Sequence, residues 1–302
     1  MGGGGNRMPS TAERLGFGSN ERVAVVHTDD IGMCEAQSAG GFEALENGPA
    51  TCGSVMVPCP GFPAAAERAR AQPELDLGVH LTLTAEWPGL RWGPVLGAEA
   101  VPSLVDADGF FPRTAAEVVQ RACPEEAETE LRAQVARALD AGIDVTHLDA
   151  HMGVAFFPPF VASYGRLMRE HHVPGFLVRP DAAALAQLGA EASEIYEEVI
   201  GGLEGDGWPL LDAFDADSLG FAPGTGAEHN RTRLERLTAG VTYLICHPAR
   251  GGPELEAIVN DGHAREFERK FYGGEPGHRA LAEHGIRTIG MRALRDLVRS
   301  SH

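Results

Sequence analysis

The sequence predicts an α/β protein of one domain whose parallel strands close, or nearly close, into a (β/α) barrel. Strand-like and helix-like runs alternate from about residue 21 to the end of the 302-residue chain. Such alternation with short connections produces parallel strands and right-handed crossovers. About eight strand-like runs are present, as a barrel requires. The first is followed by no glycine-rich dinucleotide-binding motif, which counts against an open doubly wound sheet.

The expected strands are short, rich in β-branched residues and nearly free of charge, and residues 22–28 (Arg-Val-Ala-Val-Val-His-Thr) are typical. The full set comprises residues 22–28, 52–57, 75–83, 144–149, 175–179, 209–214, 241–246 and 286–289. We expect helices between them, with apolar residues at helical spacing and glycine or proline near their ends. These helices comprise residues 35–47, 124–141, 181–203, 228–239, 260–272, 277–285 and 291–299.

The segment from residue 85 to 124 has little periodicity and contains Trp87 and Trp92. A loop of this length in a compact domain is usually functional or disordered. Because aromatic faces suit sugar rings, the two tryptophans predict an ordered loop that covers a substrate, and simple anchoring of the loop is the alternative. No internal repeat or linker interrupts the chain, so residues 19–302 are expected to form one catalytic domain.

The composition narrows the class of protein. A formal net charge of −18 argues against a nucleic acid or an anionic membrane surface as partner and favours a neutral or cationic small substrate. The five cysteines match no zinc or redox spacing and are expected to be reduced thiols in a cytoplasmic protein. Residues 1–18 are glycine-rich and polar, so we expect a disordered segment rather than a signal peptide. No stretch reaches the roughly 20 apolar residues of a membrane helix.

Two adjacent carboxylates, Asp29 and Asp30, end the first expected strand. Adjacent carboxylates at the mouth of a buried strand repel each other, and a bound cation is the simplest compensation. A turn that begins a helix is the alternative. One aspartate could bind the metal while the other accepts a proton from water.

Histidines near the ends of other strands are the expected partners. His80 lies near the end of the third strand, His151 follows the fourth, and His247 ends the seventh. Because catalytic groups of a (β/α) barrel come from the C-terminal ends of different strands, we expect these side chains to converge. One aspartate and two histidines form a common ligand set for a catalytic divalent ion. A packed or half-exposed strand residue is the alternative for His80, and a strand end before a proline-rich loop is the alternative for His247.

Three further residues have two interpretations each. Arg179, at the end of the fifth strand, could pair with Asp29 or form a salt bridge at the barrel rim. His147 lies four residues before His151, but a strand followed by a loop does not make both of them ligands. Asp149 could orient a metal-binding histidine through a hydrogen bond to its other ring nitrogen, or it could merely close the turn.

Four motifs in this order resemble those of the YdjC-like (ChbG/HpnK) carbohydrate deacetylase family. They are Asp-Asp-Ile-Gly at 29–32, Gly-Val-His-Leu-Thr-Leu-Thr at 78–84, Thr-His-Leu-Asp-Ala-His at 146–151 and Cys-His-Pro-Ala at 246–249. The resemblance spans about residues 22–250, and residues 265–271 and 286–297 also look like the C-terminal region of that family.

The resemblance implies a TIM-like barrel, distorted or incompletely closed, and one divalent metal ion, zinc or magnesium. Carried over, Asp30, His80 and His151 would be the metal ligands, Asp29 the general base and His247 the general acid. The implied reaction removes an N-acetyl group from a small amino sugar or glycoconjugate and releases acetate. A homodimer is also implied.

The sequence departs from the family after the third motif. Many members continue with further histidines, whereas Met152 and Gly153 follow His151 here. We therefore expect substrate specificity to differ, in the regions 85–124 and 201–226.

The competing functions are a metal-dependent hydrolase of a non-sugar amide or ester, a catalytically inactive carbohydrate-binding barrel, and a metal-dependent sugar isomerase or aldolase. Lys270, the only lysine, lies in an expected helix, which disfavours a Schiff-base aldolase.

Overall fold

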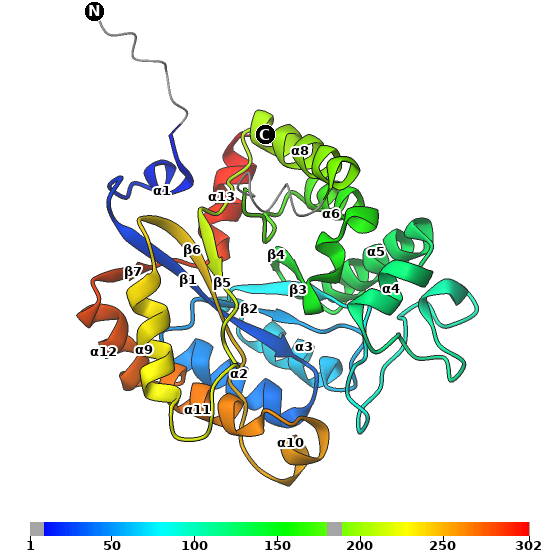
Figure 1. The fold of residues 1–302 in the computed structure, drawn as a ribbon, viewed down its shortest axis with the longest axis horizontal. Coiled ribbons are helices and arrows are strands. Elements are labelled where there is room, and N and C mark those ends of the chain that lie inside the picture. The colour runs from blue at the N-terminus through cyan, green and yellow to red at the C-terminus, as the bar shows by residue number, and fades with distance from the viewer. Residues whose placement is uncertain (1–8, 180–188, 302) are drawn as a thin grey trace, which may run out of the picture.

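The computed structural model describes residues 9–179 and 189–301, and its strands form one parallel sheet. The strand order is β4-β3-β2-β1-β6-β5, and β7 pairs with β1. The strands are β1 Arg22–Ile31, β2 Cys52–Val55, β3 Leu77–Leu81, β4 Val145–Ala150, β5 Ala213–Asp215, β6 Gly240–Cys246 and β7 Ile286–Thr288. Figure 1 shows these strands in the centre with helices around them, which confirms the predicted α/β class.

Strand β1 is the longest strand and lies at the centre of the fold. It pairs with β6 from Arg22 to Thr28 along one side. Along its other side it pairs with β7 near its start and with β2 near its end. Residues Val23 to Ile31 of β1 are all buried, which explains why this run is apolar and β-branched up to the two aspartates.

The barrel closes incompletely between β4 and β5. The sequence predicts a strand at residues 175–179, but only two isolated parallel bridges form there: Leu148 with Gly175, and Val178 with Leu211. The segment changes its pairing partner within three residues, so no continuous ladder develops. The expected strand at 209–214 is likewise shorter and shifted, to Ala213–Asp215. The prediction of a distorted, incompletely closed barrel is confirmed.

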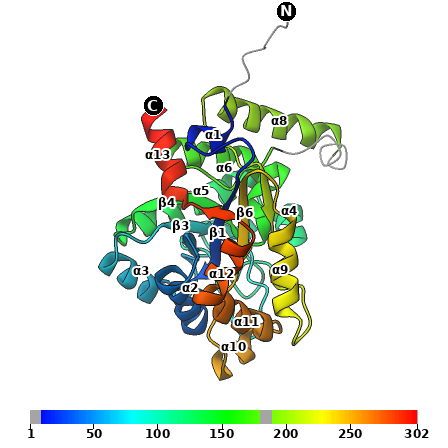
Figure 2. The same cartoon turned by 90° about the vertical axis from the view of Figure 1, so that its left-hand side faces the viewer.

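The helices cover the outside of the sheet. Helix α2 packs against β1, α5 against β3, α11 against β6 and α13 against β4. Both views place α1, α8 and α13 at the end of the molecule opposite α10 (Figure 1 and Figure 2). The helices are α1 Thr11–Arg14, α2 Glu35–Asn47, α3 Phe62–Ala71, α4 Ala115–Arg121, α5 Pro124–Asp140, α6 Pro158–His171, α8 Ala190–Gly205, α9 Gly226–Arg236, α10 Pro253–Ile258, α11 Gly262–Tyr272, α12 Glu275–Glu283 and α13 Met291–Ser301. Two 3₁₀ turns are η1 Pro102–Leu104 and η2 His151–Phe156.

One prediction about the helices needs correction, and a second can be compared with the structure only in part. Part of the segment expected to be disordered contains α1, which Ser10 caps and which buries Ala12. The Thr11 hydroxyl also donates to the carbonyl of Leu210 at 2.5 Å. The predicted helix 181–203 is confirmed only in its later part, where α8 lies; residues 180–188 and 1–8 are outside the described residues. Four further helices, α3, α4, α6 and α10, are not among those predicted.

The long segment after β3 is ordered and attached to the barrel. The indole of Trp92 is buried and donates to the carbonyl of Thr84 at 2.7 Å. The carboxylate of Glu130 in α5 accepts hydrogen bonds from the backbone of Val95 and Leu96 at 2.9 and 3.1 Å. Of the described helices, none is both long enough and apolar enough to cross a membrane.

Candidate metal centre and active site

The two aspartates occupy an irregular end of β1. The pairing register with β2 shifts between Thr28 and Ile31, so Asp29 and Asp30 leave the regular ladder. Asp30 has a φ angle of +65°, in the left-handed region that few non-glycine residues adopt. Such backbone strain is concentrated at functional sites, where the surrounding structure maintains it.

Asp30, His80 and His151 form a buried cluster that could hold a metal ion. Asp30 Oδ1 lies 3.2 Å from His151 Nδ1 and 3.5 Å from His80 Nε2. Within the described part of the chain, this carboxylate oxygen is buried and has no hydrogen-bond partner. A buried polar atom without a partner is costly, and a cation shared with the two imidazoles would satisfy it. The donor set and this free oxygen therefore fit a divalent metal.

Each imidazole of the cluster is oriented through its second nitrogen. His80 Nδ1 lies 2.9 Å from a carboxylate oxygen of Asp149 and 3.0 Å from the hydroxyl of Ser54. His151 Nε2 lies 2.9 Å from the carboxylate of Glu86, in the loop after β3. This is the arrangement found behind metal-binding histidines, in which an outer carboxylate fixes the ring and increases its basicity.

The electrostatics of the cluster favour a cation. Burial alone would raise the pKa of Asp30, but the neighbouring His151 and His80 side chains and the charge of Arg265 lower it well below its usual range. Burial lowers the pKa of an imidazole, yet the Glu86 carboxylate and Asp30 raise that of His151 to about 9. The carboxylates around His80 raise its pKa in the same way. A divalent ion bound here would compete with protons for both rings.

Arg265 is a site residue that the sequence analysis does not assign. Its guanidinium is buried and lies 2.8 Å from the second oxygen of Asp30. It also donates to Asp261 at 2.9 Å and to Gln37 at 2.8 Å. Arg265 therefore fixes Asp30 and leaves only Oδ1 directed at the histidines. The only sequence signal for it was the family resemblance at 265–271, because α11 reads as an ordinary amphipathic helix.

Asp29 and His247 lie together beside the cluster. Asp29 Oδ2 is 3.7 Å from His247 Nε2, and Asp29 Oδ1 is 2.6 Å from Nδ1 of His27. His247 Nδ1 lies 2.9 Å from the hydroxyl of Ser218, which itself donates to Glu268. His247 therefore keeps a hydrogen on Nδ1 and directs Nε2 at Asp29. Burial lowers the pKa of His247, despite the opposing effect of Asp30 and Asp29.

The other predicted site residues lie at different depths. Arg179 is exposed and pairs with Glu204, so the predicted pairing with Asp29 is replaced by the salt bridge at the rim. His147 is fully buried beneath the site and faces His27, not the candidate metal ligands. Trp92 anchors the loop, although its ring centroid lies 6.2 Å from that of His151. Trp87 is half-buried and lines the site pocket.

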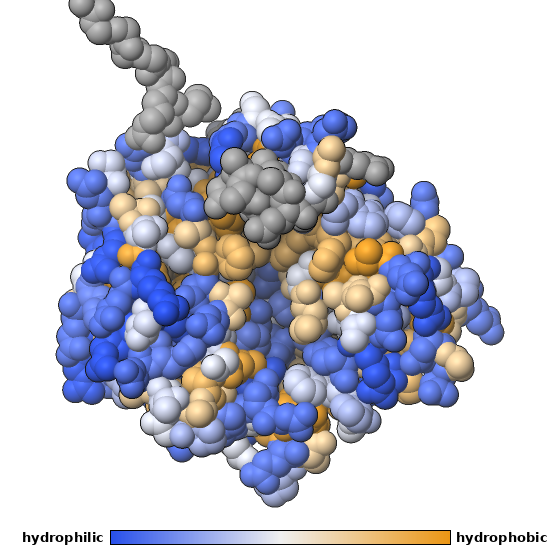
Figure 3. Space-filling model, viewed as in Figure 1, coloured by the Kyte–Doolittle hydropathy of each residue, from blue (hydrophilic) through white to orange (hydrophobic). Residues whose placement is uncertain are grey.

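The pocket above the cluster has a volume of about 570 Å³, within the range of roughly 300–1,000 Å³ for small-molecule sites. Its charged lining consists of five carboxylates and one guanidinium, apart from histidines. Apolar side chains from several elements complete it: Trp87, Met152, Phe156, Phe176, Phe214 and Leu219. In Figure 3, apolar residues gather above a hollow near the middle of the face shown.

Comparison with known proteins identifies the family of this chain. The sequence profile described as YdjC-like protein matches residues 23–283, which include every candidate ligand. The chain belongs to the YdjC-like family. The matched residues contain strands β2 to β6, nearly all of β1 and all four motifs on which the resemblance rests.

Curated proteins similar to this chain carry an enzymatic name. A Thermus thermophilus protein named carbohydrate deacetylase is 41% identical over 290 residues, covering 94% of this chain and 97% of the relative. A carbohydrate deacetylase from Geobacillus stearothermophilus is 29% identical, covering 76% of this chain and 80% of the relative. The crystal structure of an Enterococcus faecalis protein matches with a TM-score of 0.74 at 24% identity, covering 91% and 99% of the two chains, which supports the fold.

Proposed function

We propose that this protein is a metal-dependent carbohydrate deacetylase that hydrolyses the N-acetyl group of a neutral amino sugar and releases acetate. The observation that carries the proposal is the buried cluster of Asp30, His80 and His151, with its unpartnered oxygen, next to the pair Asp29 and His247. The name shared by the YdjC-like relatives supports the substrate class.

Asp30, His80 and His151 would hold one divalent ion, with zinc and magnesium as the candidates. When bound, such an ion polarises the acetyl carbonyl and makes water more acidic. The chain contributes the orientation of the ligands: Arg265 fixes Asp30, and Asp149 and Glu86 fix the two rings.

Asp29 and His247 would carry the proton transfers. Asp29 Oδ1 is held by His27, so Oδ2 is the oxygen available to accept a proton from the attacking water. A neutral His247 must gain a proton before it can donate one, and Asp29 Oδ2, 3.7 Å from Nε2, is the group on this chain that becomes protonated. His247 would then protonate the departing amine, because an amide anion is a poor leaving group.

The lining of the pocket favours an uncharged substrate. Five carboxylates face it against the single guanidinium of Arg265, which is already paired with Asp30 and Asp261. A phosphorylated sugar would meet no free cationic side chain among the described lining residues. The pocket therefore suits a neutral N-acetylated sugar, with apolar groups placed to contact a ring face or an attached substituent.

The test measures acetate release and bound metal for a matched pair of variants. Asp30→Asn should lose at least about 100-fold in metal affinity together with its activity, because a charged ligand is removed. Asp29→Asn should keep one equivalent of metal and lose at least about 100-fold in kcat, because the base is removed. Substrates are N-acetylated mono- and disaccharides, with simple non-sugar acetamides and acetate esters in parallel.

Asp206→Asn is the control, since Asp206 forms an exposed pair with Arg169 and does not line the pocket. It should behave like the wild type. If the non-sugar acetamides or esters turned over faster than the N-acetylated sugars, the substrate would belong to another class than the one proposed. Absence of acetate release from every compound by the metal-loaded protein would contradict the proposed function.

A further inference from the structure

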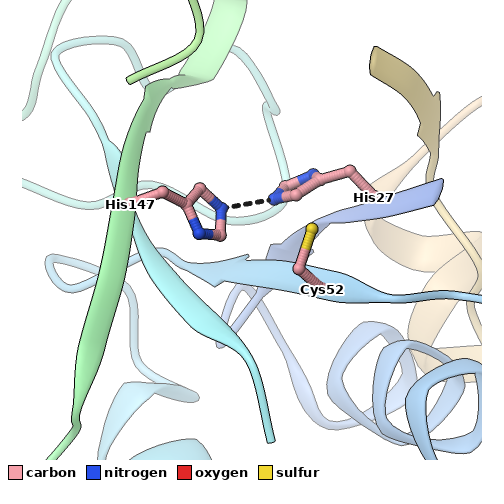
Figure 4. A group of neighbouring side chains, drawn as sticks. All are labelled: His27, Cys52 and His147. Carbon is pink, nitrogen blue, oxygen red and sulfur yellow. Dashed lines mark hydrogen bonds between the residues drawn. The ribbon is translucent and has the colours of Figure 1, made fainter. Parts of the chain in front are cut away.

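A chain of buried polar side chains runs from Asp29 into the barrel interior. His27 of β1 and His147 of β4 point toward each other, and Cys52 of β2 lies beside them (Figure 4). The two Nε2 atoms are 2.9 Å apart, and all three side chains are fully buried. Neither histidine is among the candidate ligands of the metal centre, so the pair needs its own explanation.

The outer hydrogen bonds of His147 determine where its hydrogen lies. Thr146 donates its hydroxyl hydrogen to the carboxylate of Asp76. The same hydroxyl oxygen lies 2.9 Å from His147 Nδ1 and must therefore accept a hydrogen from it. An ionised Asp76 accepts at both oxygens, since the other one accepts from the backbone N–H of Arg292 at 2.7 Å; burial raises the pKa of Asp76, and its hydrogen bonds from Thr146 and Arg292 oppose this. His147 thus carries Nδ1–H, and its Nε2 presents a lone pair to His27. Burial lowers the pKa of His147 to about 3, which keeps the ring neutral.

The outer hydrogen bond of His27 has the same consequence. Its Nδ1 lies 2.6 Å from Asp29 Oδ1, a carboxylate oxygen that can only accept, so Nδ1 donates. A neutral His27 would then also present a lone pair at Nε2. Two lone pairs facing each other at 2.9 Å in a dry interior repel. Either a proton or a metal ion must lie between the two rings.

The geometry favours the proton. A separation of 2.9 Å is that of an N–H···N hydrogen bond. Two nitrogens bound to one tetrahedral zinc at about 2.0–2.1 Å would lie roughly 3.3 Å apart. The third possible ligand is also unsuited, because burial raises the pKa of the Cys52 thiol well above its usual range and metal binding needs the thiolate.

We propose that His27 is a positioning residue that is doubly protonated, donating from Nδ1 to Asp29 and from Nε2 to the lone pair of His147. The role in catalysis rests on the proposed function of Asp29 as base. The His27 cation compensates for two adjacent carboxylates at the end of β1 and occupies Asp29 Oδ1. It thereby leaves Oδ2 directed at His247 and the pocket.

The remaining neighbours of His27 are compatible with a cation. Asp149 Oδ2 lies 3.4 Å from Nε2, so a second carboxylate faces the ring. Tyr243 stacks on the ring with centroids 4.7 Å apart, an arrangement that favours a cationic imidazole. The carboxylate of Asp76 also interacts electrostatically with His27, and neutral His147 and the Cys52 thiol lie beside the ring.

The first experiment is histidine ¹⁵N NMR on the metal-loaded protein near neutral pH, with assignment by His27→Asn and His147→Gln. We expect both nitrogens of His27 to be protonated and His147 to be the neutral Nδ1–H form. A neutral His27 with an Nε2–H form of His147, which would require a protonated Asp76, overturns the proposal. This readout does not depend on deacetylase activity, so a failure of the proposed function would be seen separately.

The second experiment measures kinetics and metal content. His27→Asn keeps a donor near Asp29 but cannot carry a charge, so we expect kcat to fall by at least about tenfold with KM within about threefold. His147→Gln supplies an oxygen acceptor for His27, so it should retain at least about tenfold more turnover than His147→Leu.

Cys52→Ala is the control that separates a proton from a metal ion. If a proton joins the rings, the variant keeps one equivalent of metal and its kcat, because Cys52 contributes only packing. If the wild type binds two equivalents and Cys52→Ala binds one, the cluster of His27, Cys52 and His147 is a second metal site and the proposal is wrong. Equal turnover of His27→Asn and the wild type would also overturn it.

Discussion

At the scale of single residues, Glu86 controls a candidate metal ligand without being one. Its carboxylate lies 2.9 and 3.1 Å from His151 Nε2, on the side opposite Asp30. Burial raises the pKa of Glu86, but the charge of His151 outweighs this and lowers it. Without a bound metal the two groups form an ion pair below about pH 9, where His151 is protonated, and this couples metal binding to pH.

We predict that Glu86→Gln loses about 10- to 100-fold in metal affinity near pH 9, because the outer carboxylate makes the ring a stronger ligand. The pKa of His151 is about 9, so below that pH a proton must leave the ring before metal binds. Wild-type affinity should therefore fall as the pH decreases from about 9. The variant ring is less basic, so its deficit should shrink near pH 6.5. Chelator competition across this range measures both effects.

Glu99→Gln provides the control for this measurement, because Glu99 is an exposed glutamate in the same loop segment. Its metal affinity should follow the wild-type curve at every pH. A deficit in Glu86→Gln that is the same at all pH values would show that His151 does not exchange a proton for the metal.

The residues of the site differ in how far the sequence reveals them. Asp30, His80 and His151 could be predicted to converge because each ends or follows a strand of one parallel barrel. Glu86 and Arg265 could not be predicted, because they reach the site from a loop and from a helix, and no periodic pattern in the sequence marks either residue. Arg179 was placed at a strand end that does not form, so its side chain points to the surface.

At the scale of elements, Gly78 permits the close approach of β3 and β4. A Cβ atom at this position would lie 2.6 Å from both the carbonyl oxygen and the ring Nε2 of His147. Neither atom can move freely, since one belongs to the sheet backbone and the other to a buried ring. We predict that Gly78→Ala lowers the free energy of unfolding by about 1–3 kcal/mol, as overpacking of a core does. Chemical denaturation measures this change.

Gly201→Ala serves as the matched control in helix α8. No atom lies within 4 Å of the Cβ position there, and alanine favours a helix interior by roughly 0.5–1 kcal/mol over glycine. The control should therefore be neutral or slightly more stable. If Gly78→Ala had the same free energy of unfolding as the wild type, β3 and β4 would be able to move apart without cost.

The elements also show where local patterns stop being informative. Strand β1 was recognisable because all its residues after Arg22 are buried, which requires an apolar run. Residues 175–178 have a similar composition, but they form only single bridges on either side of the gap between β4 and β5. Helix α6 begins with Pro158 and Pro159, which resemble a loop signal although the first turn of a helix tolerates proline.

At the scale of the whole molecule, the barrel combines an acidic centre with an apolar rim. Met152 of η2 and Phe214 of β5 line the pocket from different sides of the gap in the barrel, and these residues are 57% and 54% exposed. Large exposed apolar side chains at a pocket mouth indicate a ligand contact. The −18 net charge and the acidic lining act against anionic substrates over the same region.

We predict that Phe214→Ser raises KM about tenfold for an N-acetylated sugar bearing an aromatic or alkyl substituent and leaves KM for the free sugar within about twofold. About 55 Å² of apolar contact at roughly 25 cal/mol per Å² contributes about 1.4 kcal/mol, which is a tenfold change in affinity. Steady-state acetate release with the paired substrates measures it. Leu139→Ser is the control, because Leu139 is 43% exposed on α5 and does not line the pocket. An equal rise in KM for both substrates would show that Phe214 contacts the sugar ring itself. If KM changed for neither substrate, the apolar rim would not take part in substrate binding.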